Sequence, residues 1–219
     1  MTIDEFVTKY PELYHMAECN SWSSIQKYGL LSVTALLDLF KYDGAKREAI
    51  ESGWRPDKLA IAHPGLGRAV IRDQKPMPPD ALEPCLVGGI TSTQWYRLLN
   101  GKTFFWVGEN RLHRMLTAKA YLNEAQWVIT VRTRPLLERY VPDVTLTGFN
   151  TGFAFDGRLR GPDTFKRLKD WPNRYAVAEL AVEYGIPDVA EFVASVVEWK
   201  GVWEKGEKVC KRIKHIWPV

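Results

Sequence analysis

The stretch AELAVEYGIPDVAEFVASV, residues 178–196, decides the fold assignment because it places a carboxylate inside an apolar run typical of a buried strand. We predict a strand over residues 176–182, with Glu179 at its centre. Carboxylates disfavour strands and are almost never fully buried without a partner. Alternation places Glu179 on the less apolar of the two strand faces, where it points into a cleft or, alternatively, into solvent at a sheet edge. Glu179 is therefore a candidate site residue.

The composition is that of a globular protein and excludes several other classes. The chain has 219 residues, 46% of them hydrophobic and 26% charged, which fits one large domain or two small ones. Three cysteines without a CxxC pair predict neither a disulfide framework nor a zinc site. The sequence has no signal peptide and no long apolar run, so we expect a cytoplasmic protein with no membrane partner.

Two further numbers leave alternatives open. The net charge of +4 is too small to establish a nucleic-acid partner by itself. The nine Trp, nine Tyr and nine Phe residues indicate either a large aromatic core or flat faces for stacking on rings.

Periodicity predicts helices mainly early in the chain and strands mainly later, which favours an α+β fold over a doubly wound α/β fold. The expected helices cover residues 4–9, 21–28, 33–41, 91–100, 110–119, a short segment from Pro135, and a basic segment at 202–214. The expected strands cover residues 12–16, 103–107, 126–132, 144–146, 176–182 and 193–199. Two stretches rich in Pro and Gly, 64–84 and 148–172, are expected to be long irregular loops.

Several familiar motifs are absent or incomplete. The segment LAIAHPGLGR, residues 59–68, has two closely spaced glycines after an apolar run, but Val70 stands where a dinucleotide-binding fingerprint needs its third glycine. We therefore expect an ordinary turn there. The sequence contains no HExxH, GxSxG or phosphate-binding P-loop motif, which argues against a zinc hydrolase, an α/β-hydrolase or a P-loop enzyme.

Two other segments are candidates for ligand contact, and each also has a purely structural interpretation. His15 ends a short apolar strand, where it is either a ligand contact or a partly buried histidine bonded to a backbone group. TFFWV, residues 103–107, is either a plain core strand or a strand that offers one ring as a stacking wall.

Four segments in order resemble one family. They are His15 followed by I-x-x-x-G-L-L at 25–31, TFFWVGENRLHRM at 103–115, FNTG with DTFKRLKDW within 147–171, and residues 178–196. Together they resemble ADP-ribosyltransferases of the His-type branch, and within it the DarT-type DNA ADP-ribosyltransferase toxins. The match departs at a short 172–178 loop, at phenylalanines where a tyrosine is expected, and at residues 42–83. These departures suggest a divergent side family.

The resemblance implies an ADP-ribosyltransferase-like split β-sandwich with helices inserted in its N-terminal half. It would span residues 1–219 as a single domain, with an insertion or lid at 42–90 and a basic C-terminal helix at 202–219. It also implies NAD⁺ as the ADP-ribose donor, no metal, and transfer to a nucleic acid, with a DNA base favoured over RNA. The protein would then act as a toxin or phage-defence effector, and an antitoxin is a possible partner. The alternatives are transfer to a protein or a small nucleotide, a relative of RNA 2′-phosphotransferases, or an inactive NAD-binding relative.

The resemblance also implies a role for each candidate residue. Glu179 would be catalytic, and His15 would bind the adenosine ribose. The expected remaining contacts to NAD⁺ are the backbone of Met16 and Ala17 at the nicotinamide amide, Phe105 or else Phe104 as the stacking ring, Asn150 in its loop, and Arg72 or Arg111 at the pyrophosphate. The expected nucleic-acid contacts are Arg158, Arg160 and Arg174, with help from the terminal basic segment. The alternative for each arginine is a solvated surface charge, and for the terminal segment a solvated amphipathic face.

Overall fold

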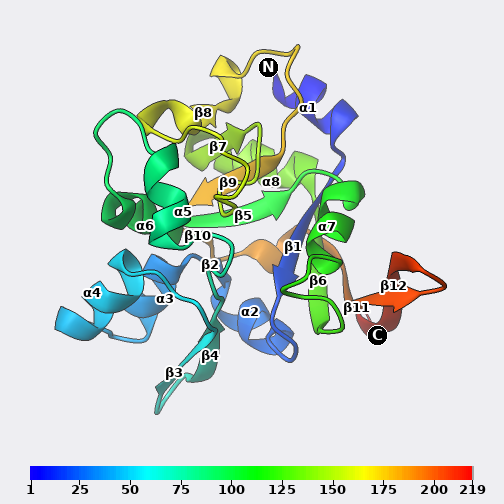
Figure 1. Cartoon of the computed structure of the whole chain (residues 1–219). Coiled ribbons are helices and arrows are strands. Elements are labelled where there is room, and N and C mark those ends of the chain that lie inside the picture. Colours follow the sequence, from blue (N-terminus) through cyan, green and yellow to red (C-terminus); the bar gives the residue numbers. More distant parts are fainter. Residues whose placement is uncertain (219) are drawn as a thin grey trace.

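The computed structural model describes residues 1–218, which form an α+β fold around one large antiparallel sheet (Figure 1). The order of its eight strands is β12-β11-β6-β1-β5-β9-β7-β8. Their bounds are β1 (Glu12–Ala17), β5 (Lys102–Trp106), β6 (Ala125–Arg132), β7 (Val144–Thr147), β8 (Lys166–Arg167), β9 (Glu179–Glu183), β11 (Val193–Glu204) and β12 (Glu207–Trp217). Two small antiparallel pairs accompany it, β2 (Leu30–Leu31) with β10 (Gly185–Ile186) and β3 (Leu59–His63) with β4 (Gly67–Ile71).

The sheet forks at its centre. Strand β1 pairs with β6 along its whole length, from Glu12 to Ala17. On its other side β1 shares a single register pair with β5, between Tyr14 and Trp106. Beyond this pair the two strands separate, so the edge of β1 from His15 to Ala17 faces open space instead of a neighbouring strand.

Helices pack on both sides of the sheet and between its halves (Figure 1). Their bounds are α1 (Ile3–Lys9), α2 (Trp22–Tyr28), α3 (Val33–Leu39), α4 (Gly44–Ser52), α5 (Pro79–Leu82), α6 (Ser92–Asn100), α7 (Glu109–Leu116) and α8 (Thr133–Tyr140). Five short 3₁₀ turns lie at Glu83–Cys85, Val141–Asp143, Pro162–Thr164, Leu168–Asp170 and Val189–Glu191. None of the helices described for residues 1–218 has the length and apolar character that a bilayer crossing requires.

Side-chain caps explain where the predicted helices begin. Thr2 and Thr91 each form a capping box, with Glu5 and Gln94 respectively, and so satisfy backbone donors at the start of α1 and α6. Ser32 accepts from the backbone N–H of Ala35 and starts α3, as predicted. The sequence-based prediction of these helices is confirmed to within a few residues.

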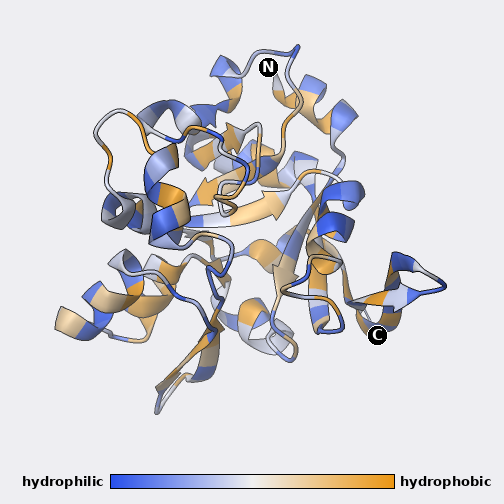
Figure 2. Cartoon of the chain, viewed as in Figure 1, coloured by the Kyte–Doolittle hydropathy of each residue, from blue (hydrophilic) through white to orange (hydrophobic). Residues whose placement is uncertain are grey.

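The largest apolar core lies on one face of the sheet. Phe105, Ile129 and Leu180 from β5, β6 and β9 are almost completely buried there, together with Phe6 from α1 and Leu136 from α8. In Figure 2 the central strands show long orange stretches, whereas the outer faces of the helices are mostly blue. The strand carrying Glu179 therefore packs its Leu180 face into the core and turns its other face away.

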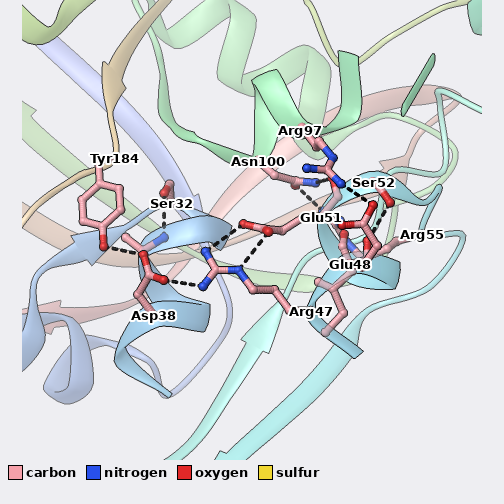
Figure 3. A network of polar contacts seen from close by, with 12 residues as sticks. Ser32, Asp38, Arg47, Glu48, Glu51, Ser52, Arg55, Arg97, Asn100 and Tyr184 are labelled. Atoms are coloured by element: carbon pink, nitrogen blue, oxygen red, sulfur yellow. Dashed lines mark hydrogen bonds and ion pairs between the residues drawn. The ribbon is translucent and has the colours of Figure 1, made fainter. Parts of the chain in front are cut away.

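The segment expected to be an insertion, residues 42–90, has secondary structure of its own. It contains α4, the β3–β4 hairpin and α5, and charged side chains connect α4 to the neighbouring helices (Figure 3). Arg47 on α4 forms ion pairs with Asp38 on α3 and with Glu51, while Glu48 pairs with Arg97 on α6. These contacts attach the segment to the rest of the fold at several points.

The hairpin corrects part of the loop prediction. Residues 64–84 were expected to be irregular, but 67–71 form β4, which pairs with β3. The turn between them closes with a hydrogen bond from the Leu66 N–H to the His63 carbonyl, and Gly67 has a φ of 80°, which favours glycine. The expectation of an ordinary turn instead of a dinucleotide-binding loop is thus confirmed.

The prediction of a basic C-terminal helix is wrong, because residues 202–217 complete a long β-hairpin. Strands β11 and β12 meet at a two-residue turn, Lys205–Gly206, with φ values of 51° and 85°. Two consecutive positive φ values are the mark of a type I′ hairpin turn, in which glycine is favoured. The turn at Lys205–Gly206 and the pairing of the two strands outweigh the helical spacing of Trp203, Val209 and Ile213.

Candidate functional site

A cavity of about 740 Å³ occupies the fork between β1 and β5. Its volume lies within the range of about 300–1,000 Å³ that is usual for ligand sites. One wall is the end of β1 and the turn after it (residues 15–21), and another is the start of β5 (residues 102–104). Strand β4 with the segment after it closes a third side, and residues 150–152 with Glu179 form the fourth. The cavity therefore collects segments that are far apart in the sequence.

Glu179 is held at this wall by one of its two carboxylate oxygens. It lies at the start of β9, is only 4% exposed, and contacts the cavity. Its Oε2 accepts hydrogen bonds from the Thr151 N–H at 3.0 Å and the Thr151 hydroxyl at 2.8 Å, and it lies 3.2 Å from the Thr147 hydroxyl, which also lies 2.8 Å from the Phe149 carbonyl oxygen. Within the described part of the chain, Oε1 accepts no hydrogen bond. One oxygen is thus fixed and the other is available to a ligand.

The buried position changes the acidity of Glu179. Burial raises the pKa of this carboxyl to about 7, against the opposing effect of the hydrogen bonds from Thr151 and Thr147 and the positive charge of Arg111. Near neutral pH the group therefore exists in both protonation states. Strongly perturbed carboxyls in a cleft are typical of functional sites.

His15 faces the same cavity as a neutral ring. Burial lowers its pKa to about 4, so the imidazole is uncharged at neutral pH. Its Nδ1 lies 2.9 Å from the Phe104 carbonyl oxygen, and a carbonyl can only accept, so Nδ1 carries the proton. In this tautomer Nε2 has a free lone pair. His15 is therefore a hydrogen-bond acceptor for a hydroxyl or amide donor of a ligand.

Met16 and Ala17 also line the cavity, as expected from the sequence. Both belong to the part of β1 that pairs with β6 on one side only, opposite Val128 and Trp127. The other edge of the strand presents backbone polar groups that no register pair with β5 covers. Such an edge is suited to bind an amide through the backbone.

The two phenylalanines of β5 have different environments. Phe104 lines the cavity, and its carbonyl holds His15. Phe105 does not line it, because its register partner is Leu180 and both side chains lie in the core. Of the two candidates, the structure brings Phe104 to the cavity, where its ring also packs 6.2 Å from the ring of Phe165, and it places Phe105 in the core. The ring of Phe105 packs instead edge-on against His15, with centroids 5.8 Å apart.

Arg72 comes from the segment after β4 and lines the cavity. Its Nη1 donates to the Gln126 Oε1 at 2.7 Å, and its guanidinium lies 5.4 Å from the centre of the Tyr121 ring. Its Nη2 is enclosed and has no hydrogen-bond partner among the described residues. Because this nitrogen has almost no accessible surface, it does not itself face the cavity; the positive charge of Arg72 beside the cavity makes the residue a candidate anion contact.

Arg111 and Asn150 are placed near Glu179 in different ways. Arg111, on α7, does not line the cavity, although its charge acts on Glu179. Burial, followed by the charge of Arg114, lowers the pKa of Arg111. Asn150 does line the cavity, but its Oδ1 accepts from the Gly152 N–H at 3.0 Å and so shapes its own loop. Of the two arginines offered for a pyrophosphate, the structure brings Arg72 to the cavity.

The three arginines expected to contact nucleic acid have different surroundings. Arg158 and Arg174 are exposed and lie outside the cavity lining. Arg160 is fully buried, and its guanidinium donates to the carbonyls of Arg158 and Phe153 and to the Asp156 carboxylate at 3.1 Å. The expectation that Arg160 contacts nucleic acid is therefore corrected, because this side chain holds the loop together from inside.

Sequence reasoning missed the residues that support the candidate site. Thr147 and Thr151 both contact the carboxylate of Glu179. Thr151 directly follows Asn150 in the FNTG segment, and its hydroxyl beside a glycine is the feature of the sequence that could have indicated this role. Arg55 and Lys102 are buried cations at the cavity wall. Lys102 pairs with Glu183, which compensates its charge, whereas Arg55 donates to neutral oxygens, among them the Asn100 Oδ1 at 2.8 Å. No local pattern in the sequence marks these two.

Comparison with known proteins adds one finding. A family described as "Family of unknown function (DUF7002)" matches residues 11–193, which is most of the chain. The chain belongs to the DUF7002 family. Among curated proteins, none matches it. The matched region includes His15, the fork and Glu179, and ends at the first residue of β11, so most of the β11–β12 hairpin lies beyond it.

Proposed function

We propose that this DUF7002 protein is an NAD⁺-dependent mono-ADP-ribosyltransferase that modifies a nucleic acid, with a DNA base as the favoured acceptor. The observation that carries the proposal is Glu179, a buried carboxylate with one fixed and one free oxygen, facing a cavity that also contains the neutral His15. In this proposal the fork between β1 and β5 corresponds to the opening of a split ADP-ribosyltransferase-like sandwich.

The main chemical requirement of the proposed reaction is a negative charge placed close to C1′ of the ribose. The bond between C1′ of the ribose and the nicotinamide nitrogen breaks, and its electron pair leaves with nicotinamide. Positive charge develops on the ribose, and a nearby carboxylate stabilises it. The acceptor nucleophile then bonds to C1′ and releases a proton, which Glu179 takes as a general base. The free Oε1 is the oxygen available for both tasks.

The remaining cavity residues fit the parts of NAD⁺. His15 Nε2 accepts from a ribose hydroxyl, and the unpaired edge of β1 at Met16 and Ala17 holds the carboxamide. The Phe104 ring provides the apolar surface for nicotinamide, and the positive charge of Arg72 attracts the pyrophosphate. Aromatic, backbone and cationic groups thus surround one cavity, as recognition of a dinucleotide requires.

The acceptor side of the proposal rests on the charge of the exposed loops. Arg158 and Arg174 are exposed on the segment between β7 and β9, which also carries the residues that hold Glu179. Under the same proposal the protein acts as a toxin or phage-defence effector, and a neutralising antitoxin is an expected partner.

The test is transfer of mass from NAD⁺ to an acceptor. Purified protein is incubated with NAD⁺ and, separately, with DNA oligonucleotides, RNA oligonucleotides and a protein lysate. Intact mass spectrometry then looks for an added ADP-ribose, before and after nuclease or protease digestion. Addition to DNA supports the proposal as stated. Addition to protein alone shows that the acceptor is a protein and not a nucleic acid. If no nicotinamide is released with any acceptor, the proposed activity is contradicted.

A further inference from the structure

The β11–β12 hairpin is a surface that the candidate site does not explain. Strand β6 pairs with β11 only as far as Lys200, and from Gly201 onward β11 pairs with β12 alone. The hairpin therefore projects from the sheet as a two-stranded ribbon, visible at the right of Figure 1. Nearly all of it follows residues 11–193, the region that the family model matches.

The β11–β12 hairpin taken as a whole carries an excess of positive charge, whereas its projecting part, residues 201–210, holds two lysines and two glutamates. From Ala194 onward the sequence has six Lys or Arg residues against three Glu residues, a large share of the net charge of +4. Lys211 pairs with Glu204 at 2.9 Å, and Arg212 pairs with Glu109 at 3.1 Å. Within residues 1–218, the other four cations of the ribbon form no ion pair; they are Lys200, Lys205, Lys208 and Lys214.

Two of the three glutamates of the hairpin have partners other than these four lysines, although Glu198 also lies opposite Lys214 in the strand register. Glu198 accepts a hydrogen bond from the Trp127 indole at 3.1 Å, and Glu204 is already paired with Lys211. Lys200 and Lys211 lie directly opposite each other across the two strands. Like charges in this arrangement destabilise a sheet. The ion pair of Lys211 with Glu204 offsets part of this repulsion and leaves Lys200 without an ion pair among residues 1–218.

The ribbon also exposes large apolar side chains between its charges. Trp203 is 60% exposed near the turn, and Ile213, at an irregularity in the register, is 51% exposed. In Figure 2 the turn end of the ribbon is mostly blue. Lysines that only guard a free sheet edge against strand addition would not need an exposed tryptophan beside them.

We propose that the β11–β12 ribbon binds duplex DNA by entering its major groove. A two-stranded ribbon fits the wide major groove of B-form DNA, whereas the major groove of an RNA duplex is too narrow to admit one. Lys205, Lys208 and Lys214 contact phosphates, and Trp203 makes apolar contact inside the groove. This inference deepens the proposed function by naming what holds the acceptor nucleic acid, and it rests on that function only for what happens to the bound DNA.

The experiment measures binding without NAD⁺, so that it does not depend on catalysis. Fluorescence anisotropy follows a short labelled DNA duplex titrated with the full chain, with the triple variant Lys205→Gln, Lys208→Gln, Lys214→Gln, and with a matched control. The control is Lys46→Gln, Lys119→Gln, Lys169→Gln, which removes three exposed lysines elsewhere. The logarithm of the association constant falls as the logarithm of the salt concentration rises, and the loss of three phosphate contacts makes this fall less steep by about 3. We also expect at least a tenfold loss of affinity. The control retains wild-type binding.

Two outcomes overturn the inference. If the ribbon variant and the control lose the same amount of affinity for the DNA duplex, binding depends on the total charge of the protein and not on the ribbon. Equal wild-type affinity for an RNA duplex or a single strand of the same sequence excludes recognition through the major groove. Nicotinamide release, measured on the same proteins, separates the two proposals: the ribbon variant keeps it whether or not the ribbon binds DNA, and its absence from the wild type contradicts only the proposed activity.

Discussion

Thr151 donates two hydrogen bonds to a single oxygen of Glu179, one from its backbone N–H and one from its hydroxyl. This contact joins the loop after β7 to the start of β9 and leaves Glu179 Oε1 free toward the cavity. The loop itself is held by the buried Arg160, so the orientation of the carboxylate depends on residues outside the cavity. The predictions below follow from this arrangement.

Replacing Thr151 by valine keeps the shape of the side chain and removes one donor to the ionised carboxylate. Because hydrogen bonds to the charged form lower a carboxyl pKa, the variant raises the pKa of Glu179 further. We expect the rise of nicotinamide release with pH to move to higher pH by about 0.5–1 pH unit, as the loss of a hydrogen bond of about 1 kcal/mol implies.

The matched control is Thr145→Val on β7. Thr145 is also a buried threonine, but its hydroxyl has no hydrogen-bond partner within residues 1–218. Its pH profile is expected to match the wild type. An equal shift in both variants shows that the effect comes from general disturbance of the loop and strand.

The raised pKa of Glu179 also makes stability depend on pH. In the folded protein this carboxyl holds its proton up to a pKa of about 7, whereas the reference value is 4.5. The protonated Glu179 therefore contributes its full amount to the free energy of unfolding below about pH 4.5, and this contribution is lost as the pH rises through 7. The total loss is on the order of 3 kcal/mol.

The comparison of wild type with Glu179→Gln isolates this contribution, because every other titrating group is shared. The free energy of unfolding is measured in urea between about pH 5 and 8. We expect the free energy of unfolding of the variant, relative to that of the wild type, to increase as the pH rises across this interval. A constant difference between the two proteins contradicts a raised pKa at Glu179.

Replacing His15 by alanine removes the acceptor Nε2 from the cavity. One hydrogen bond worth about 1.4 kcal/mol corresponds to a tenfold change in Kd, and calorimetric titration with NAD⁺ measures it. His113→Ala serves as the control, because His113 lies on α7 outside the cavity lining. Unchanged NAD⁺ affinity in the His15 variant removes this residue from the site.

The two phenylalanines of β5 are expected to respond differently to truncation. Phe104→Ala opens the cavity wall, so we expect weaker NAD⁺ binding with a modest loss of stability. Phe105→Ala leaves a hole in a closely packed core, which costs about 3–5 kcal/mol of unfolding free energy. Denaturant unfolding together with calorimetry separates the two effects. The reverse pattern would show that Phe105 is the ring that meets the ligand.

The sequence predicted the fold class and many of the elements because local signals and tertiary packing agree there. Thr91 and Gln94 cap a helix wherever it packs, and the apolar run around Leu180 is buried in any sheet. The terminal segment differs from the predicted helix because Trp203, Val209 and Ile213 share one side of a helix, whereas in the hairpin Trp203 and Val209 lie on opposite faces. The local signal for a hairpin is the turn at Lys205–Gly206.

The site was predicted less completely than the fold. Glu179 and His15 were found because each is unusual in an apolar strand, and both line the cavity. Their supporting groups were not, since a threonine such as Thr147 is ordinary in a strand until its partner is known. The burial of Arg160 is a tertiary property that a Gly-flanked basic loop does not reveal.

The most direct test of the proposed activity is nicotinamide release from NAD⁺ by the wild type and by Glu179→Gln, in the presence of DNA. Glutamine keeps the size of the side chain and can still accept from Thr151, so the fold is retained while the negative charge is lost. We expect release by the wild type and a loss of at least about a thousandfold in the variant, within the range for removing a key electrostatic group. Glu138→Gln, an exposed substitution on α8, should release nicotinamide at the wild-type rate. Nicotinamide release by Glu179→Gln at the wild-type rate would contradict the account.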